Sequence, residues 1–264
     1  MKDTDNSITF SFGQNWLDYL KTVGNTEIEK AIKDILEYLD EETVKKSRIL
    51  DIGSGSGIHS SAFYKLGAKE VRSFDYDEYS VEATKYMHKL CESPVNWKVG
   101  RGSILDSEFV ESLGKFDIVY SWGVLHHTGN MWEAIKNAMK LVSPGGKLWI
   151  TLYVKGPNYQ THLSLKKRYN NATETGKKWI IRKYILRLML HRLLHFKNPF
   201  TWNEKRERGM NVYHDIIDWL GGLPYEVASP DEVLRFGRQN GMIMERIRIV
   251  PEGGCNYYLF SNQG

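Results

Sequence analysis

The chain has 264 residues, which suits one large domain or a domain with an added segment. Hydrophobic residues make up 41% of it, charged residues 26%, and the net charge is +4, a composition that excludes a disordered protein. The N-terminus lacks the pattern of a signal peptide, and no run approaches the roughly 20 apolar residues that span a bilayer. We therefore expect a cytoplasmic protein without a transmembrane segment. Cys91 and Cys255, the two cysteines, have no metal-site spacing and predict neither a disulfide framework nor a metal centre.

Apolar runs and helical patterns alternate through the first 154 residues. Isoleucine and leucine at helical spacing behind Thr26 predict a leading helix over residues 26–40. The strands predicted next are residues 48–52, 71–74, 96–100, 116–121 and 147–154, and the helices between them are residues 58–66, 80–90 and 131–141. Residues 143–146, "SPGG", predict a turn. Strands that alternate with helices indicate a doubly wound α/β fold with a mostly parallel sheet.

The C-terminal segment predicts one helix and a hairpin. Ser229 is placed as an N-cap, Glu232 completes a capping box, and Gly241 ends the helix. Residues 242–250 and 256–261 predict two antiparallel strands joined by "PEGGC". With the five upstream strands they complete a seven-stranded sheet whose ligand site lies at the carboxyl ends of the strands.

The stretch "RILDIGSGSGIHS", residues 48–60, has three glycines between a strand and a helix. Gly53, Gly55 and Gly57 let the backbone turn sharply and approach a ligand without interference from a Cβ atom. A Walker loop needs Gly-Lys-Ser/Thr, which is absent, and the dinucleotide pattern G-x-G-x-x-G fails at Ile58. Phosphate is therefore not the expected ligand.

Two acidic residues flank this loop. Asp51, two residues before the first glycine, would repel a pyrophosphate but suits a ligand with an ammonium group. Asp75 ends the second predicted strand, where a carboxylate can accept hydrogen bonds from both hydroxyls of a ribose. S-adenosylmethionine carries an ammonium group and a ribose, so the sequence favours this cofactor. A dehydrogenase is the main alternative.

The chain resembles the class I S-adenosylmethionine-dependent methyltransferase family through five stretches in the family's order. They are "ILDIGSGSG", "VRSFDYDEYSVEA", "GRGSILD", "FDIVYSWGVLHH" and "LVSPGGKLWITLY", within about residues 45–154. The resemblance implies a Rossmann-like fold and S-adenosylmethionine as the cofactor. The stretch "RGMNVYHDIIDWLGGLPYEVASPDEV", with "GCNYYLF", resembles a bacterial subgroup associated with cell-surface polysaccharide and other small-molecule pathways.

This resemblance implies a set of cofactor contacts. The glycines approach the methionine part of the cofactor, Asp75 the ribose, and Ser103 with Ile104 the adenine; Ser103 stands where an aspartate is common in the family. The expected cofactor-binding residues are Asp51, Gly53, Gly55, Gly57, Asp75, Tyr76, Ser103, Ile104 and Ser121. We expect residues 1–154 to form the N-terminal helices and cofactor-binding core, residues 155–210 a basic helical insertion, and residues 211–264 the completion of the core sheet.

Two motifs that are absent from the sequence narrow the choice of acceptor atom. Relatives that methylate planar amino groups often carry Asn/Asp-Pro-Pro-Tyr where this chain has "SWGV", residues 121–124, and no Pro-Cys pair is present for a covalent route. A hydroxyl oxygen is therefore the expected acceptor, and it needs a base. Candidate bases are His59, His126, His127, His214 and Asp215. Neighbouring residues on a helix do not share a face, so we expect one of the last two, His214, to point inward, with Asp215 and His127 as further catalytic candidates.

Residues 155–210 form a strongly basic segment, with 14 Lys and Arg against 3 Asp and Glu, or +11, which leaves −7 elsewhere. The segment is expected to cover the carboxyl edge of the sheet as a lid. Its predicted helix, residues 177–196, carries an apolar stripe of Trp179, Leu186, Leu190 and Leu193. Basic residues point in several other directions, which disfavours a membrane-surface helix.

Three classes of anionic partner could bind to this positive charge. We expect a small anionic acceptor, such as a nucleotide-linked or phosphorylated sugar, with RNA as the second choice and an acidic membrane surface as the third. A solvated face without a partner and a non-catalytic cofactor-binding subunit are the remaining alternatives. The sequence does not predict an oligomeric state.

Overall fold

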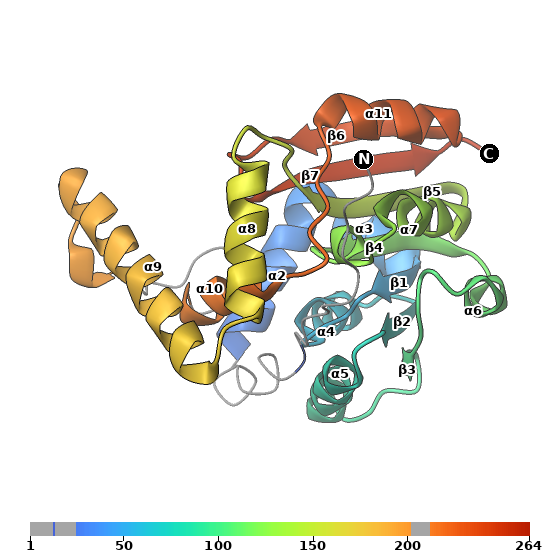
Figure 1. Cartoon of the computed structure of the whole chain (residues 1–264). Coiled ribbons are helices and arrows are strands. Elements are labelled where there is room, and N and C mark those ends of the chain that lie inside the picture. The colour runs from blue at the N-terminus through green and yellow to red at the C-terminus, as the bar shows by residue number, and fades with distance from the viewer. Residues whose placement is uncertain (1–12, 14–24, 202–211) are drawn as a thin grey trace.

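The computed structural model, which describes residues 13, 25–201 and 212–264, has one seven-stranded sheet in the order β3-β2-β1-β4-β5-β7-β6. Its strands are β1 (Arg48–Ile52), β2 (Glu70–Asp75), β3 (Trp97–Arg101), β4 (Phe116–Trp122), β5 (Val142–Tyr153), β6 (Met242–Arg248) and β7 (Cys255–Asn262). The first five strands are parallel, and β7 is antiparallel to both of its neighbours (Figure 1). The predicted doubly wound fold with a C-terminal antiparallel hairpin is confirmed.

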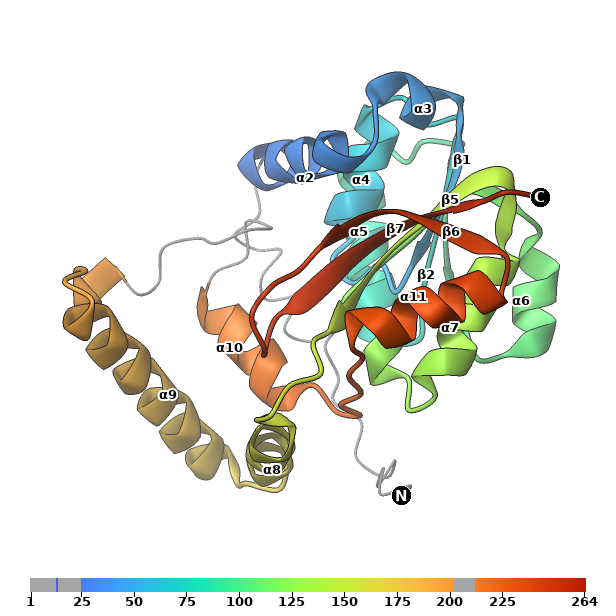
Figure 2. The same ribbon diagram turned by 90° about the horizontal axis from the view of Figure 1, so that it is seen from above.

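Helices cover both faces of the sheet (Figure 2). One face packs α2 (Asn25–Tyr38), α3 (Glu41–Lys46), α4 (Ile58–Lys65) and α5 (Glu78–Leu90), and the other packs α6 (Ser107–Leu113), α7 (Met131–Lys140) and α11 (Pro230–Gln239). Side chains alternate along a strand, so Leu148 and Ile150 of β5 enter one core while Trp149 enters the other. Burial on both faces explains why the central strands read as continuous apolar runs.

Local signals place most of these elements within a few residues of prediction. The capping box at the start of α11 is present, since Ser229 Oγ accepts a hydrogen bond from the Glu232 backbone and the Glu232 carboxylate accepts one from the Ser229 backbone. The sequence analysis did not predict α3, whose signal was Asp40: its side chain accepts a hydrogen bond from the Thr43 backbone as an N-cap.

The turn predicted at residues 143–146 does not interrupt the fifth strand. β5 begins at Val142, which pairs with Phe116, and the next pair is Lys147 with Ile118. Four residues of β5 therefore stand opposite one residue of β4, and the ladder absorbs "SPGG" as an irregularity. The difference arises because strand pairing continues on both sides of a local turn signal.

The basic segment forms α8 (Tyr159–Asn170), α9 (Glu174–Leu194) and η2 (Pro199–Thr201), and the chain returns through α10 (Val212–Gly221). Buried residues of α8, α9 and α10 make a separate apolar cluster: Tyr169, Ile180, Ile181, Val212, Ile216 and Leu220. α9 leans away from the sheet (Figures 1 and 2). The predicted helix is confirmed, but the face that it packs is not the predicted apolar stripe, which faces solvent.

The division into three parts stays a prediction. None of the helices described is both long and apolar enough to cross a membrane.

All three glycines in the loop between β1 and α4 have a positive φ, which favours glycine, and at two of them an added Cβ would also clash. Gly53 has a φ of +72°, and a Cβ on it would lie 2.4 Å from the methyl carbons of Val124. Gly57 has a φ of +77° and is the N-cap of α4; a Cβ there would lie 2.9 Å from the Thr84 Cα. The second contact is with backbone, so a rotamer change cannot relieve it.

Gly57→Ala should therefore lower the free energy of unfolding by about 1–3 kcal/mol, because it combines a left-handed backbone with a clash. Gly100→Ala is the matched control, because an added Cβ there has no neighbour within 4 Å. Denaturant unfolding of both variants measures the difference. Equal midpoints for the two variants would show that the loop does not depend on glycine at this position.

Candidate active site

The carboxyl ends of β1, β2 and β4 meet around a cavity of about 690 Å³. β1 pairs with β2 on one side and with β4 on the other. The order in which successive strands are added to the sheet therefore reverses between β1 and β4. Open α/β sheets bind ligands at such a switch point. The wall runs from the glycine loop, through the ends of β2 and β3, to the segment after β4 and to α10.

Asp51 lies at the base of this cavity and is 2% exposed. Ser60 Oγ donates a hydrogen bond to its carboxylate at 2.5 Å. Ser60 Oγ lies 2.7 Å from Ser73 Oγ, which in turn accepts a hydrogen bond from Trp97 Nε1 at 2.8 Å. Burial, with a smaller contribution from nearby Asp75, raises the pKa of Asp51 to about 7. A ligand cation at this position would relieve the cost of keeping the carboxylate charged.

Asp75 ends β2 and accepts two backbone hydrogen bonds, from Gly55 and Asp77, both at 3.0 Å. Burial raises its pKa to about 6, against the lowering effect of these donors. A carboxylate can accept about four hydrogen bonds, so acceptor capacity remains for ligand hydroxyls. The backbone of Gly53 also donates to the Phe74 carbonyl oxygen at 2.8 Å, which fixes the loop against β2.

The turn after β3 forms the next part of the wall. Asn137 of α7 donates a hydrogen bond to the Ile104 carbonyl oxygen at 2.9 Å, and Ile104 is almost fully buried. Ser103 Oγ accepts a hydrogen bond from the Leu105 backbone at 3.2 Å and so stabilises its own turn. Tyr76 stands at the rim and is largely exposed. This arrangement offers an apolar surface for a flat ring.

Two of the expected cofactor residues lie outside the wall. Ser121 Oγ is buried and donates to the Ile52 carbonyl oxygen at 3.0 Å, which joins β4 to β1. Gly57 packs against Thr84. The other seven line the cavity: Asp51, Gly53, Gly55, Asp75, Tyr76, Ser103 and Ile104.

The far half of the cavity is lined by His126 and His127 of η1 (Leu125–His127). His127 Nδ1 lies 2.7 Å from the Pro224 carbonyl oxygen. A carbonyl can only accept, so Nδ1 carries the proton and Nε2 has the lone pair. Burial, aided by the positive charge of Lys166, lowers the pKa of His127 to about 3. The imidazole is therefore neutral near pH 7.

His126 is completely buried, and burial keeps its pKa well below the usual value. Within the described part of the chain, neither of its ring nitrogens makes a hydrogen bond of normal geometry. Buried polar atoms are ordinarily paired, so an unsatisfied imidazole in a cavity wall is typical of a ligand site. The "LHH" pattern placed both histidines here, but the sequence did not show which of the two would be paired.

Lys166 of α8 is buried behind this half of the cavity. Its Nζ lies 4.7 Å from the ring centroids of Trp219 and Tyr225 and donates a hydrogen bond to the Trp219 carbonyl oxygen. Burial lowers its pKa to about 7. The sequence analysis missed this residue among the other lysines and arginines. Its helical spacing with Tyr159 and Tyr169, which also pack inward, was the available signal.

His214 and Asp215 do not belong to the cavity wall. Both lie on α10, and Asp218, one turn after His214, is the residue of this helix that lines the cavity. Tyr153 and Cys255 complete this end. Catalytic roles for His214, Asp215 and His127 stay predictions.

The sheet order, the glycine loop and two carboxylates at neighbouring strand ends together define an S-adenosylmethionine-dependent methyltransferase site. Comparison with known proteins agrees, because a family model described as a methyltransferase domain matches residues 25–194. The chain belongs to this methyltransferase family. The carboxylates of Asp51 and Asp75 fit the ammonium group and ribose of S-adenosylmethionine, which supplies the methyl group when bound.

The chain is also similar in sequence to known methyltransferases. Ubiquinone biosynthesis O-methyltransferases of Pelagibacter ubique and Coxiella burnetii are 27% and 30% identical over 122 and 117 residues, which is 46% and 44% of this chain. The alignments cover 48% of each relative, so the chain spans about half their length.

PKMT2 from Rickettsia typhi has a TM-score of 0.61 at 15% identity, over 97% of this chain and 54% of that one. Magnesium protoporphyrin IX methyltransferase from Synechocystis, solved with bound SAH, has a TM-score of 0.54 at 12% identity, over 89% and 81%. At these identities the two structures show a shared fold.

The raised pKa of Asp51 predicts a pH dependence of cofactor binding. A cationic ligand favours the ionised carboxylate, which is lost as the pH falls through about 7, so the affinity for S-adenosylhomocysteine should fall between pH about 7 and about 5. Asp51→Asn should bind more weakly at neutral pH and show a shallower dependence. Calorimetry across this range measures both, and identical pH profiles for the two proteins would exclude Asp51 from the ammonium contact.

Proposed function

We propose that the chain transfers the methyl group of S-adenosylmethionine to a hydroxyl oxygen of a small anionic acceptor. The observation that carries the proposal is the hydrogen bond from His127 Nδ1 to the Pro224 carbonyl oxygen, because it leaves the Nε2 lone pair as the basic site of the ring. This imidazole lines the same cavity as Asp51 and Asp75. One cavity therefore offers both a cofactor half and an acceptor half.

In the cofactor half, we assign roles by chemistry. Asp51 takes the ammonium group and Asp75 the ribose hydroxyls, while Ser103 and Ile104 contact the adenine. Gly53 and Gly55 allow close approach of the methionine part; Gly57, Ser121 and Tyr76 support the loop, the strand ends and the rim. These roles follow from the position and burial of each residue.

Methyl transfer from a sulfonium is an in-line displacement, so the protein mainly aligns the acceptor and removes its proton. His127 is neutral near pH 7, so its Nε2 can accept the hydroxyl proton. Burial is the larger cause of its low pKa, and the positive charge of Lys166 is the smaller one. An anionic acceptor would offset the charge of Lys166 and so remove this smaller part of the lowering of the His127 pKa. The pair thus favours an acceptor with a phosphate or carboxylate group.

A nucleotide-linked or phosphorylated sugar of a surface polysaccharide is the acceptor class that we propose. Support comes from the buried Lys166 and from O-methyltransferases among the relatives. His214, on the same face of α10 as Asp218 and one turn before it, is the second candidate base, with Asp215 beside it.

RNA is the competing acceptor. A tRNA U34 carboxymethyltransferase of Idiomarina loihiensis is 31% identical over 111 residues, and the basic segment suits a polyanion. A labelled-methyl screen of small-molecule extracts and bulk RNA separates the two. Transfer to small anions with an ether-linked product supports the proposal, whereas label in RNA alone would overturn it. No transfer to either pool would favour a non-catalytic subunit.

With an acceptor from this screen, His127→Ala should lower turnover by about 10²–10⁴-fold and leave cofactor affinity unchanged, because the base acts in the transition state. His195→Ala, an exposed histidine outside the cavity wall, is the control. His214→Ala tests the second candidate. Near-normal turnover of His127→Ala at saturating cofactor would remove His127 from the mechanism.

A further inference from the structure

The helix α9 has two apolar faces of different kinds. Its inner face carries the buried Ile180 and Ile181, which pack in the cluster shared with α8 and α10, together with Tyr184 and Leu188. Its outer face carries the predicted stripe, Trp179, Leu186, Leu190 and Leu193, whose exposed fractions lie between 51% and 58%. The inner face accounts for the stability of the helix, and the outer face contributes nothing to the core.

Basic residues border the outer stripe. With about 3.6 residues per turn, Arg182 and Lys183 fall on opposite edges of it, and Arg187 lies on the same side as Lys183. All three are exposed. Lys177 and Arg192 are directed elsewhere, since Lys177 pairs with Glu174 and Arg192 donates to the Asn198 carbonyl oxygen. Three of the basic residues therefore flank the apolar stripe, and two others are held away from it by contacts of their own.

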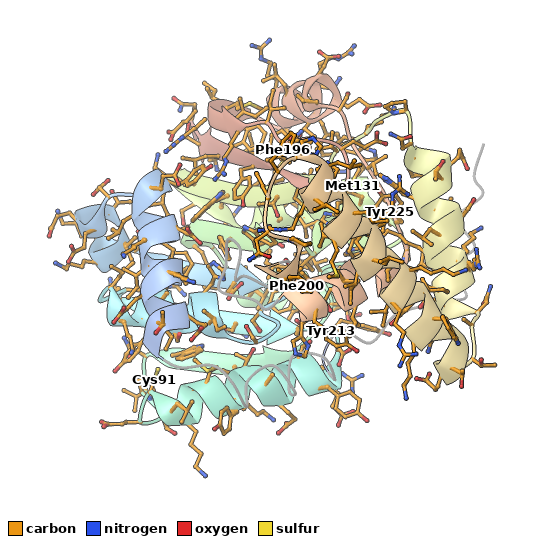
Figure 3. The ribbon with its side chains drawn as sticks, turned by 90° about the vertical axis from the view of Figure 1, so that its left-hand side faces the viewer. Cys91, Met131, Phe196, Phe200, Tyr213 and Tyr225 are labelled. Carbon is orange, nitrogen blue, oxygen red and sulfur yellow. The ribbon has the colours of Figure 1, made fainter. Side chains whose placement is uncertain are left out.

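We define residues 174–200 as the arm. Its end adds further exposed apolar side chains. Leu194, Phe196 and Phe200 are strongly exposed, and Phe196 is fully so. In Figure 3 α9 faces the viewer, and Phe196 and Phe200 are labelled. The arm holds seven Lys and Arg and one acidic residue, Glu174. Large exposed apolar patches with a charged border mark interaction surfaces.

We propose that the outer face of the arm docks onto an anionic lipid surface. In this arrangement α9 lies in the plane of the interface, with the leucines of the stripe at the acyl boundary and the flanking lysine and arginines among the headgroups. The helix is interrupted by too many charges to cross a bilayer. Its apolar stripe, bordered by cations between Arg182 and Arg187, has the chemistry of a helix that lies on a membrane.

Charge and side-chain type favour this partner over two others. Two copies of the arm packed face to face would bring like charges together, which opposes a symmetric dimer. RNA binding to unpaired bases relies on aromatic platforms, whereas the stripe is mostly leucine. Aliphatic side chains between cations match acyl chains below anionic headgroups. The inference does not depend on the acceptor, because no residue of the arm lines the cavity.

Vesicle co-sedimentation of the full chain tests the proposal. Vesicles of phosphatidylglycerol and phosphatidylcholine in equal parts should bind the protein, vesicles of phosphatidylcholine alone should bind it at least about tenfold more weakly, and added salt should weaken the binding. The double variant Leu186→Gln with Leu190→Gln should lose at least about tenfold in affinity for the anionic vesicles. Arg182→Gln with Lys183→Gln should weaken it through the charge.

Leu90→Gln, at the end of α5, is the matched control, because Leu90 is 57% exposed and lies outside the arm. Calorimetry with S-adenosylhomocysteine verifies that each variant is folded. Equal binding to neutral and anionic vesicles, no vesicle binding, or an unchanged affinity in the double leucine variant would each overturn the proposal. So would a concentration-dependent dimer that the leucine variant abolishes without any vesicle binding, or binding of bulk RNA alone.

Discussion

The placement of two carboxylates at neighbouring strand ends, Asp51 buried and Asp75 partly buried, is the constraint on which the site depends. Asp51 and Asp75 are held by donors from the glycine loop and from Ser60, yet burial still raises the pKa of both. An empty site therefore keeps its carboxylates at a cost that a cation with hydroxyl groups removes. The parallel sheet makes this possible, because it brings the ends of β1 and β2 together at one edge.

The strands, the glycine loop and the two carboxylates are the parts of the structure that could be predicted from the sequence. Alternating strands and helices indicated the sheet, and the spacing of Asp51, the glycines and Asp75 indicated the cofactor, because these signals are local. Positions set by tertiary packing could not be read in the same way. "SPGG" has turn chemistry, but pairing of β5 with β4 continues past it.

The half of the cavity that His126 and His127 line shows the same limit. The adjacent pair His126 and His127 was visible in the sequence, but the Pro224 carbonyl that fixes the tautomer of His127 lies 97 residues away. Lys166 looked like one more charge in a basic segment, whereas three aromatic rings enclose it. His214 has suitable chemistry, yet it is Asp218 that lines the cavity. Long-range contacts decide these assignments, and the periodicity of a helix gives only the face.

The insertion after β5 combines these two kinds of information. Its charge was evident from composition, but the separation of α9 into a packed face and an exposed face required the positions of α8 and α10. The same segment therefore places Lys166 behind the half of the cavity that the two histidines line and carries an exposed face that no residue of the cavity wall shares.

Calorimetric titration of S-adenosylhomocysteine and NAD into the wild-type protein and Asp75→Asn tests the central claim most directly. The account predicts binding of the methionine nucleoside at about micromolar strength, a loss of at least about tenfold in the variant, and no comparable response to NAD. Tight NAD binding with no response to S-adenosylhomocysteine would contradict it.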